Sequence, residues 1–222
     1  MDTKYLDDDL FRCFLGYGSI TCLKKKSDTD TAFQNWFAWA EKSSGNKLLK
    51  LCLDRGGKYM SSALWNFLSE NGIEHQMTVP HTPQQNGRAE HFNCTLLNKS
   101  KAMQQHACLP PTFWQDAIEM SLHIYNQQPM RCLNWFSLIQ LWNGTKPDVS
   151  YFRTFGCRAY VFIPRDKQAN KLAPKSEDMT FIGYEPGTKG YCFWSKIRRM
   201  VVISSTATFD EFNLPNCRRE KA

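Results

Sequence analysis

The apolar positions between residues 17 and 128 follow two spacings, one typical of strands and one typical of helices. Alternating or nearly continuous apolar runs predict strands over residues 17–23, 48–53 and 73–79. The stretches between and after them predict helices over residues 28–42, 61–70, 88–106 and 113–127. The run from Leu48 to Leu53 is apolar at almost every position, which suits a strand buried on both faces. An α/β fold, in which helices cover both faces of a sheet, is the resulting expectation.

Short apolar runs separated by turns replace the helical pattern in the last third of the chain. They predict strands over residues 157–163, 179–184, 191–194 and 200–209. Four or five short strands in so short a segment are typical of a small barrel. We therefore expect four parts: an α/β domain over 1–128, a loop-rich linker over 129–150, a barrel over 151–211 and a loose tail over 212–222.

The composition predicts a packed interior, and the net charge predicts a polyanionic partner. Hydrophobic residues make up 42% of the chain and aromatic residues 14%, which is enough for a core. A net charge of +7 favours a partner such as nucleic acid. No run of 18 apolar residues occurs, and the chain starts with acidic rather than basic residues. We therefore expect an intracellular protein with no membrane partner.

The nine cysteines are scattered along the chain and form no CxxC pair. No pair of histidines at zinc-ligand spacing accompanies them. This pattern disfavours both a disulfide scaffold and a zinc finger.

Two carboxylates stand where an α/β sheet places its ligands. Asp54 follows the strand that ends at Leu53, and Glu90 lies in the first turns of the long helix. The 35 residues from 55 to 89 separate them, so only the fold can bring them together. Converging carboxylates could hold Mg²⁺ or Mn²⁺ for an in-line phosphoryl transfer. The alternative is that Asp54 caps a turn and Glu90 is a solvated helix residue.

The order of these segments, and the motifs in them, resemble a known family. The stretch LCLDRGGKYMSS, followed by GIEHQMTVPHTPQQNGRAEHFNCTL, closely resembles the integrase core of copia-type retrotransposons. Further on, LPPTFWQDAIEMSLHIYNQQP resembles a helix of that family, and KLAPKSEDMTFIGYEPGTKGYCFW resembles its SH3-like barrel. The resemblance covers about residues 14–211.

This resemblance implies a ribonuclease-H-like core, incomplete at its N-terminus, followed by a small SH3-like β-barrel. It implies a retrotransposon integrase that joins DNA 3′ ends to double-stranded target DNA with Mg²⁺ or Mn²⁺. Such an enzyme would act in the nucleus, reside in the cytoplasm as part of an element particle, and work as a homo-oligomer. Asp54 and Glu90 match the second and third acids of the family's Asp-Asp-Glu triad, so they would be the catalytic and metal-binding residues.

Four further residues are candidates for contact with nucleic acid. Asn86 and Gly87 match a mobile loop beside the family's active site, and a plain turn is the alternative. Lys99 and Lys101, on the helix that carries Glu90, could contact phosphate, and a solvated surface is the alternative.

The chain also departs from the family pattern. The first acid of the triad should lie on a strand well before residues 14–18, and this chain does not extend that far back. His91, Cys94 and Cys192 stand where the family has arginine, and Lys58 stands where it has glutamate. We therefore expect the chain as given to be inactive, with a non-catalytic nucleic-acid-binding module as the alternative function. A barrel that binds chromatin proteins is a third possibility, which competes with a core role for its Phe and Trp residues.

Overall fold

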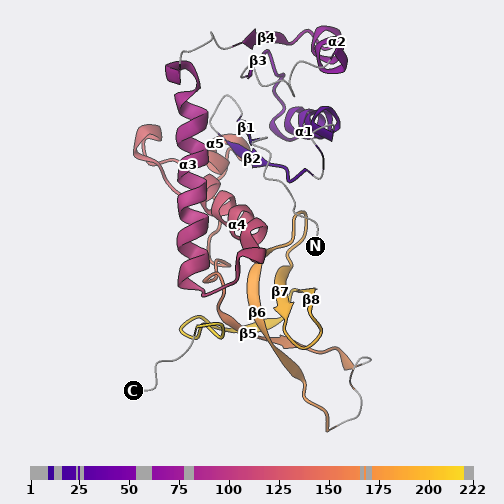
Figure 1. The fold of residues 1–222 in the computed structure, drawn as a ribbon, viewed down its shortest axis with the longest axis vertical. Helices are drawn as coiled ribbons and strands as arrows, with labels where there is room; N and C mark the ends of the chain where they lie inside the picture. The colour runs from indigo at the N-terminus through magenta and orange to yellow at the C-terminus, as the bar shows by residue number, and fades with distance from the viewer. Residues whose placement is uncertain are drawn as a thin grey trace. The chain divides into compact units, whose positions relative to one another are not determined.

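The structure, a computed structural model, describes residues 10–12, 17–23, 25, 28–53, 62–77, 83–165, 168 and 172–217 (Figure 1). The chain divides into two compact units. The first unit comprises Met1–Cys94 and Gln128–Lys146, and the second comprises Thr95–Gln127 and Pro147–Ala222. None of the helices in the described ranges combines the length and the apolar character that a membrane span requires.

Helices α1 (Thr29–Ser44) and α2 (Ser62–Glu70) supply most of the core of the first unit. Gly45 ends α1 in a left-handed conformation, with φ of 68°, and its N–H donates to the Glu41 carbonyl. The buried side chains of this core are Phe33, Trp36, Phe37, Ala40, Leu64, Leu68 and Ile73. The helical stripes predicted over 28–42 and 61–70 are confirmed, and their aromatic residues serve as core.

The strands of the first unit form two separate pairs. Strands β1 (Leu10–Arg12) and β2 (Gly18–Ile20) pair antiparallel, whereas β3 (Lys50–Leu53) and β4 (Glu74–Met77) pair parallel. Among the described residues, β3 is bonded to β4 and to no other strand. The expectation of a strand buried on both faces over 48–53 is therefore wrong at its start. Leu49, whose carbonyl accepts a hydrogen bond from the Glu74 N–H at 2.9 Å, is 73% exposed.

The segment 129–150, expected to be a loop-rich linker, contains the short helices η4 (Arg131–Leu133) and α5 (Leu138–Asn143). Ser137 caps α5 by accepting a hydrogen bond from the Gln140 N–H at 3.2 Å. Trp142 of α5 packs against the first core, and its Nε1 donates to Ser43 Oγ at 3.0 Å. This part of the chain is thus folded onto α1.

Helix α3 (Pro83–His106) is one continuous helix that contributes to both units (Figure 1). It begins five residues before the predicted start at Arg88. The prediction gave residues 84–87 to a turn because Asn-Gly is typical turn chemistry. Pro83 accounts for the difference: proline suits the first turn of a helix, where its missing N–H has no partner to lose.

A five-stranded antiparallel sheet in the order β8-β7-β6-β5-β9 forms the second unit. Its strands are β5 (Arg158–Phe162), β6 (Ser176–Tyr184), β7 (Tyr191–Ser195), β8 (Met200–Ser204) and β9 (Ala207–Asp210). The predicted strands are confirmed, and the last predicted run is split in two. Phe181 and Phe193 have no exposed surface, which places these two aromatic residues in the core.

Helix α4 (Trp114–Gln127) follows η3 (Pro111–Phe113) and packs on β6. Ala117 and Met120 belong to the same core as Phe181 and Phe193. On its other side, α4 meets α3, where the buried Ser121 hydroxyl donates to the Leu96 carbonyl at 3.2 Å. The second unit therefore combines the sheet with two helical segments.

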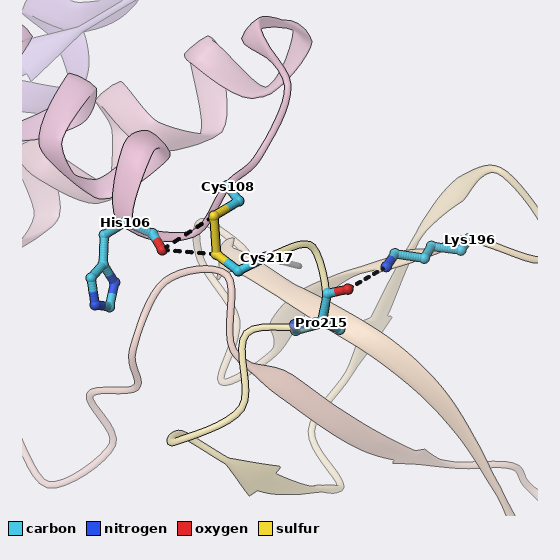
Figure 2. Close-up of a disulfide and its surroundings, with 5 residues drawn as sticks. All are labelled: His106, Cys108, Lys196, Pro215 and Cys217. Carbon is cyan, nitrogen blue, oxygen red and sulfur yellow. Dashed lines mark hydrogen bonds between the residues drawn. A yellow bond between two sulfur atoms is a disulfide. The ribbon is translucent and has the colours of Figure 1, made fainter. Parts of the chain in front are cut away.

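The segment 211–217, which we call the strap, lies half-buried along the second unit, with Phe212 the exception. Its last residue, Cys217, is bonded by a disulfide to Cys108 in the turn after α3 (Figure 2). The sequence had suggested a loose tail here, because the segment is polar. The pairing of two cysteines 109 residues apart is a tertiary feature that spacing could not reveal.

Candidate functional site

Asp54, the first of the two candidate acids, lies outside the described residues. The chain reaches it directly from Leu53, the last residue of β3. Because β3 and β4 run parallel, their carboxyl ends lie at the same edge of the pair, with Leu53 opposite Met77. In α/β sheets ligands bind beyond the carboxyl ends of strands.

Glu90, the second candidate acid, lies on α3 with its side chain exposed to solvent. Phe92 and Leu96, on the same helix, are almost fully buried and fix the face that α3 turns inward. The helix thus holds Glu90 in a regular backbone and leaves its carboxylate accessible, as a metal ligand or catalytic group requires.

Within the described part of the chain, no group of three or more His, Cys, Asp or Glu side chains is placed to hold a metal ion. Asp54 lies outside that part of the chain, so the convergence of Asp54 and Glu90 stays a prediction. Their donor atoms suit the assignment, because carboxylate oxygens are the ligands that Mg²⁺ and Mn²⁺ prefer.

The candidate nucleic-acid residues all fall on α3. Asn86 and Gly87 lie in its first turns rather than in a loop; the side chain of Asn86 is outside the described residues. An added Cβ at Gly87 would meet no atom within 4 Å, so the glycine is not there to avoid a clash. Lys101 is exposed, as a phosphate contact requires.

Lys99 has a different environment from Lys101. Its Nζ lies 5.5 Å from the centre of the Tyr125 ring, at cation–π distance. Partial burial lowers the pKa of the Lys99 ammonium group. Lys99 on α3 therefore contacts Tyr125 on α4, and this contact helps to hold the two helices together. Sequence reasoning did not foresee it, because the two residues lie on different helices.

A polar cluster around His123 is a second feature that the sequence did not reveal. The His123 Nε2 lies 2.9 Å from the Tyr151 hydroxyl, and the Gln127 amide donates to the same hydroxyl at 2.8 Å. Burial lowers the pKa of His123 to about 4. At neutral pH this histidine is therefore uncharged and adds nothing to the basic surface. Its partner Tyr151 lies 28 residues away, and no motif in the sequence links them.

Comparison with known proteins finds one domain family and several polyproteins that are similar to this chain. Residues 157–221 match the retroviral polymerase SH3-like domain, which covers the five-stranded sheet and the strap. A retrovirus-related Pol polyprotein from transposon TNT 1-94 of Nicotiana tabacum is 35% identical over 192 residues, 86% of this chain. A Pol polyprotein from transposon RE1 of Arabidopsis thaliana is 30% identical over 203 residues, 91% of this chain.

The second unit therefore contains an SH3-like domain of the retroviral polymerase type. The chain is similar to retrovirus-related Pol polyproteins of copia-like transposons. It spans 14% of the length of each of these two relatives.

Among solved structures, the catalytic core domain of HTLV-2 integrase, determined with magnesium, is similar over 58% of this chain and 78% of its own. Its identity is 22% and the TM-score is 0.45.

Proposed function

We propose that this chain is the integrase portion of a copia-type Pol polyprotein, with a ribonuclease-H-like core that the SH3-like domain follows. The observation that carries the proposal is the 35% identity to the TNT 1-94 polyprotein over 192 of the 222 residues. An alignment of that length must include residues 31–192, and with them both candidate acids. The motifs around Asp54 and Glu90 are the ones that resemble the integrase core.

In this proposal Asp54 and Glu90 hold Mg²⁺ or Mn²⁺ through their carboxylate oxygens. Such an ion, when bound, would polarise the phosphodiester that a DNA 3′-hydroxyl attacks. The part of the chain itself is to position the acids: β3 leads into Asp54, and α3 fixes the backbone of Glu90. Lys101 would contact a DNA phosphate from the same helix.

The partners follow from the same proposal. The net charge of +7 suits double-stranded DNA, both the element ends and the target. We also propose homo-oligomers as the working form and the nucleus as the place of action, with the cytoplasmic particle as an earlier stage.

Manganese binding tests the metal site directly. We expect the wild-type chain to bind Mn²⁺, and Asp54→Asn or Glu90→Gln to weaken that binding at least about tenfold, because each removes a ligand oxygen charge. Glu70→Gln is the matched control, since Glu70 is an exposed acid on α2 in the same unit. Equal Mn²⁺ affinity in the wild type and both acid variants would refute the site.

DNA binding and 3′-end joining test the rest of the function. We expect double-stranded DNA to bind with an affinity that falls steeply as salt rises. Joining that Asp54→Asn abolishes would show a complete catalytic site, and joining at background level in both proteins would show none. DNA binding without a metal site would favour the non-catalytic module, and absence of DNA binding would exclude both functions.

A further inference from the structure

The disulfide between Cys108 and Cys217 joins two segments that hydrogen bonds hold in different ways. Cys108 lies in the turn that follows α3, with a left-handed φ of 51°. Its neighbours Ala107 and Leu109 are buried in the core of the second unit. Their N–H groups donate to the Met103 and Gln104 carbonyls at 2.9 and 3.1 Å. The turn is therefore anchored whether or not the disulfide is present.

The strap, on the other side of the disulfide, has weaker support toward its end. It begins firmly, because the Glu211 carboxylate accepts hydrogen bonds from the Thr154 N–H and hydroxyl, both at 2.9 Å. The Asn213 carbonyl accepts from the Arg158 N–H at 2.8 Å. Beyond Asn213 the hydrogen bonds are longer. The Lys196 ammonium group, which is exposed, donates to the Pro215 carbonyl at 3.3 Å (Figure 2).

The Cys217 N–H adds one bond within the strap, to the Leu214 carbonyl at 3.1 Å. The bond from Lys196 to the Pro215 carbonyl is solvent-exposed and contributes little net stability, since water replaces it. Leu214 also packs against the core of the second unit, so the covalent bond to Cys108 is the main restraint at the end of the strap, at Cys217 itself.

The disulfide is open to small thiols. Cys108 is an exposed residue, and Figure 2 shows its sulfur bonded to that of Cys217. Exposed disulfides are the ones that exchange with small thiols, whereas buried ones resist reduction. Burial is the main cause that raises the thiol pKa of two other cysteines, Cys157 and Cys192, to about 12. Those two thiols are poor competitors for exchange.

We propose that the pair Cys108 and Cys217 is a redox-controlled clasp that fixes the end of the strap when oxidised and frees it when reduced. The thiolate of a small thiol such as glutathione attacks Cys108 Sγ and forms a mixed disulfide there, and Cys217 leaves as a thiolate and takes up a proton. A second small thiol attacks the mixed disulfide and releases Cys108 as a thiol. The net change is two electrons and two protons gained by the protein, and one small-molecule disulfide formed.

A hydrogen-bond acceptor lies close to both sulfur atoms and would be available to a thiol after reduction. The His106 carbonyl oxygen lies 3.3 Å from Cys217 Sγ and 4.0 Å from Cys108 Sγ. Once reduced, the Cys217 thiol can donate to this oxygen, which is a weak hydrogen bond in place of a covalent one. Reduction therefore loosens the strap without unfolding the unit, and a small-molecule disulfide restores the clasp by the reverse exchange.

Hydrogen exchange on the wild-type chain, with and without glutathione, tests the clasp without any substitution. We expect the Cys217 amide to exchange about 30-fold faster after reduction, the lower end of what a disulfide typically contributes. The amides of Ala107 and Leu109 serve as internal references and should exchange at unchanged rates. Alkylation followed by peptide mass mapping should show Cys108 and Cys217 blocked before reduction and both labelled after it.

Variants separate the clasp from a general effect of reductant. Cys217→Ser should exchange at Cys217's position like the reduced wild type, with or without glutathione. Cys132→Ser, which removes an exposed free thiol, should behave like the wild type. Full labelling of both cysteines under oxidising conditions would overturn the proposal. So would an exchange rate at residue 217 that reduction leaves unchanged, or equal acceleration at Ala107 and Leu109.

Discussion

Two glycines of the second unit share a left-handed backbone but differ in what surrounds them. Gly156 has φ of 80°, and a Cβ added there would lie 2.2 Å from the Cβ of Ala107. Gly187 has φ of 75° and would meet nothing within 4 Å. The first glycine is needed for close approach as well as for backbone conformation, and the second for conformation alone.

Replacing each glycine by alanine should separate these two costs. We expect Gly187→Ala to lower the free energy of unfolding by about 1 kcal/mol, the cost of a left-handed non-glycine residue. Gly156→Ala should lower it by about 3 kcal/mol, because the overpacked contact with Ala107 adds to that cost. Urea denaturation measures both values. Equal losses of unfolding free energy in the two variants would show that Ala107 leaves room for a Cβ at position 156.

His123 should make the stability of the second unit depend on pH. Its pKa is about 4 in the folded protein and 6.5 in the unfolded chain, so between these values the unfolded state binds more protons. The stabilisation is complete above pH 6.5 and is lost as the pH falls toward 4. The loss attributable to this group should be about 3 kcal/mol. His123→Gln should remove that part of the slope when both proteins are unfolded by urea across this range, and parallel curves would contradict the assignment.

At the scale of elements, α3 is the segment where turn chemistry and helix formation compete. Asn86-Gly87 is typical of a turn, yet both residues lie in the helix that begins at Pro83. The sequence could place α1, α2, α4 and the strands of the sheet, because their apolar spacing follows the periods of helices and strands. It could not decide the start of α3, where propensity and context disagree. The Lys99–Tyr125 contact and the disulfide were equally out of reach, because each joins residues from different segments.

Gly87→Ala tests whether this part of α3 is helical. Glycine in a helix interior is unfavourable, and no neighbour obstructs a Cβ here. We therefore expect the variant to gain about 0.5–1 kcal/mol of stability. A thermal melt of the first unit would register the gain. A loss of stability would instead point to a backbone conformation that only glycine adopts, as in the mobile loop that the family resemblance implies.

At the scale of the whole molecule, the described residues form two hydrophobic cores that share no residue. Each draws on segments that are distant in sequence. The first joins α1 and α2 to Trp142, and the second joins the α3–η3 turn and α4 to the sheet. Because the two cores share no side chain, each can unfold at its own temperature.

We therefore expect two calorimetric transitions, each sensitive to its own core. Leu68→Ala should destabilise only the first unit, by about 2–5 kcal/mol, and Phe193→Ala only the second, by about 3–5 kcal/mol. Both side chains are almost fully buried, so the two variants are matched in burial. A single transition that shifts equally with either substitution would show that the units fold as one.

Strand β8 forms one border of the sheet, and in the described residues its hydrogen-bonding partner is β7. Val201 and Ile203 are exposed along it, at 45% and 54%. An outer strand with unpaired backbone groups and apolar side chains is a template on which another chain can stack. A preparation of this protein at high concentration is therefore prone to aggregate through β8, and lysine in place of Ile203 is the substitution that would keep it monodisperse.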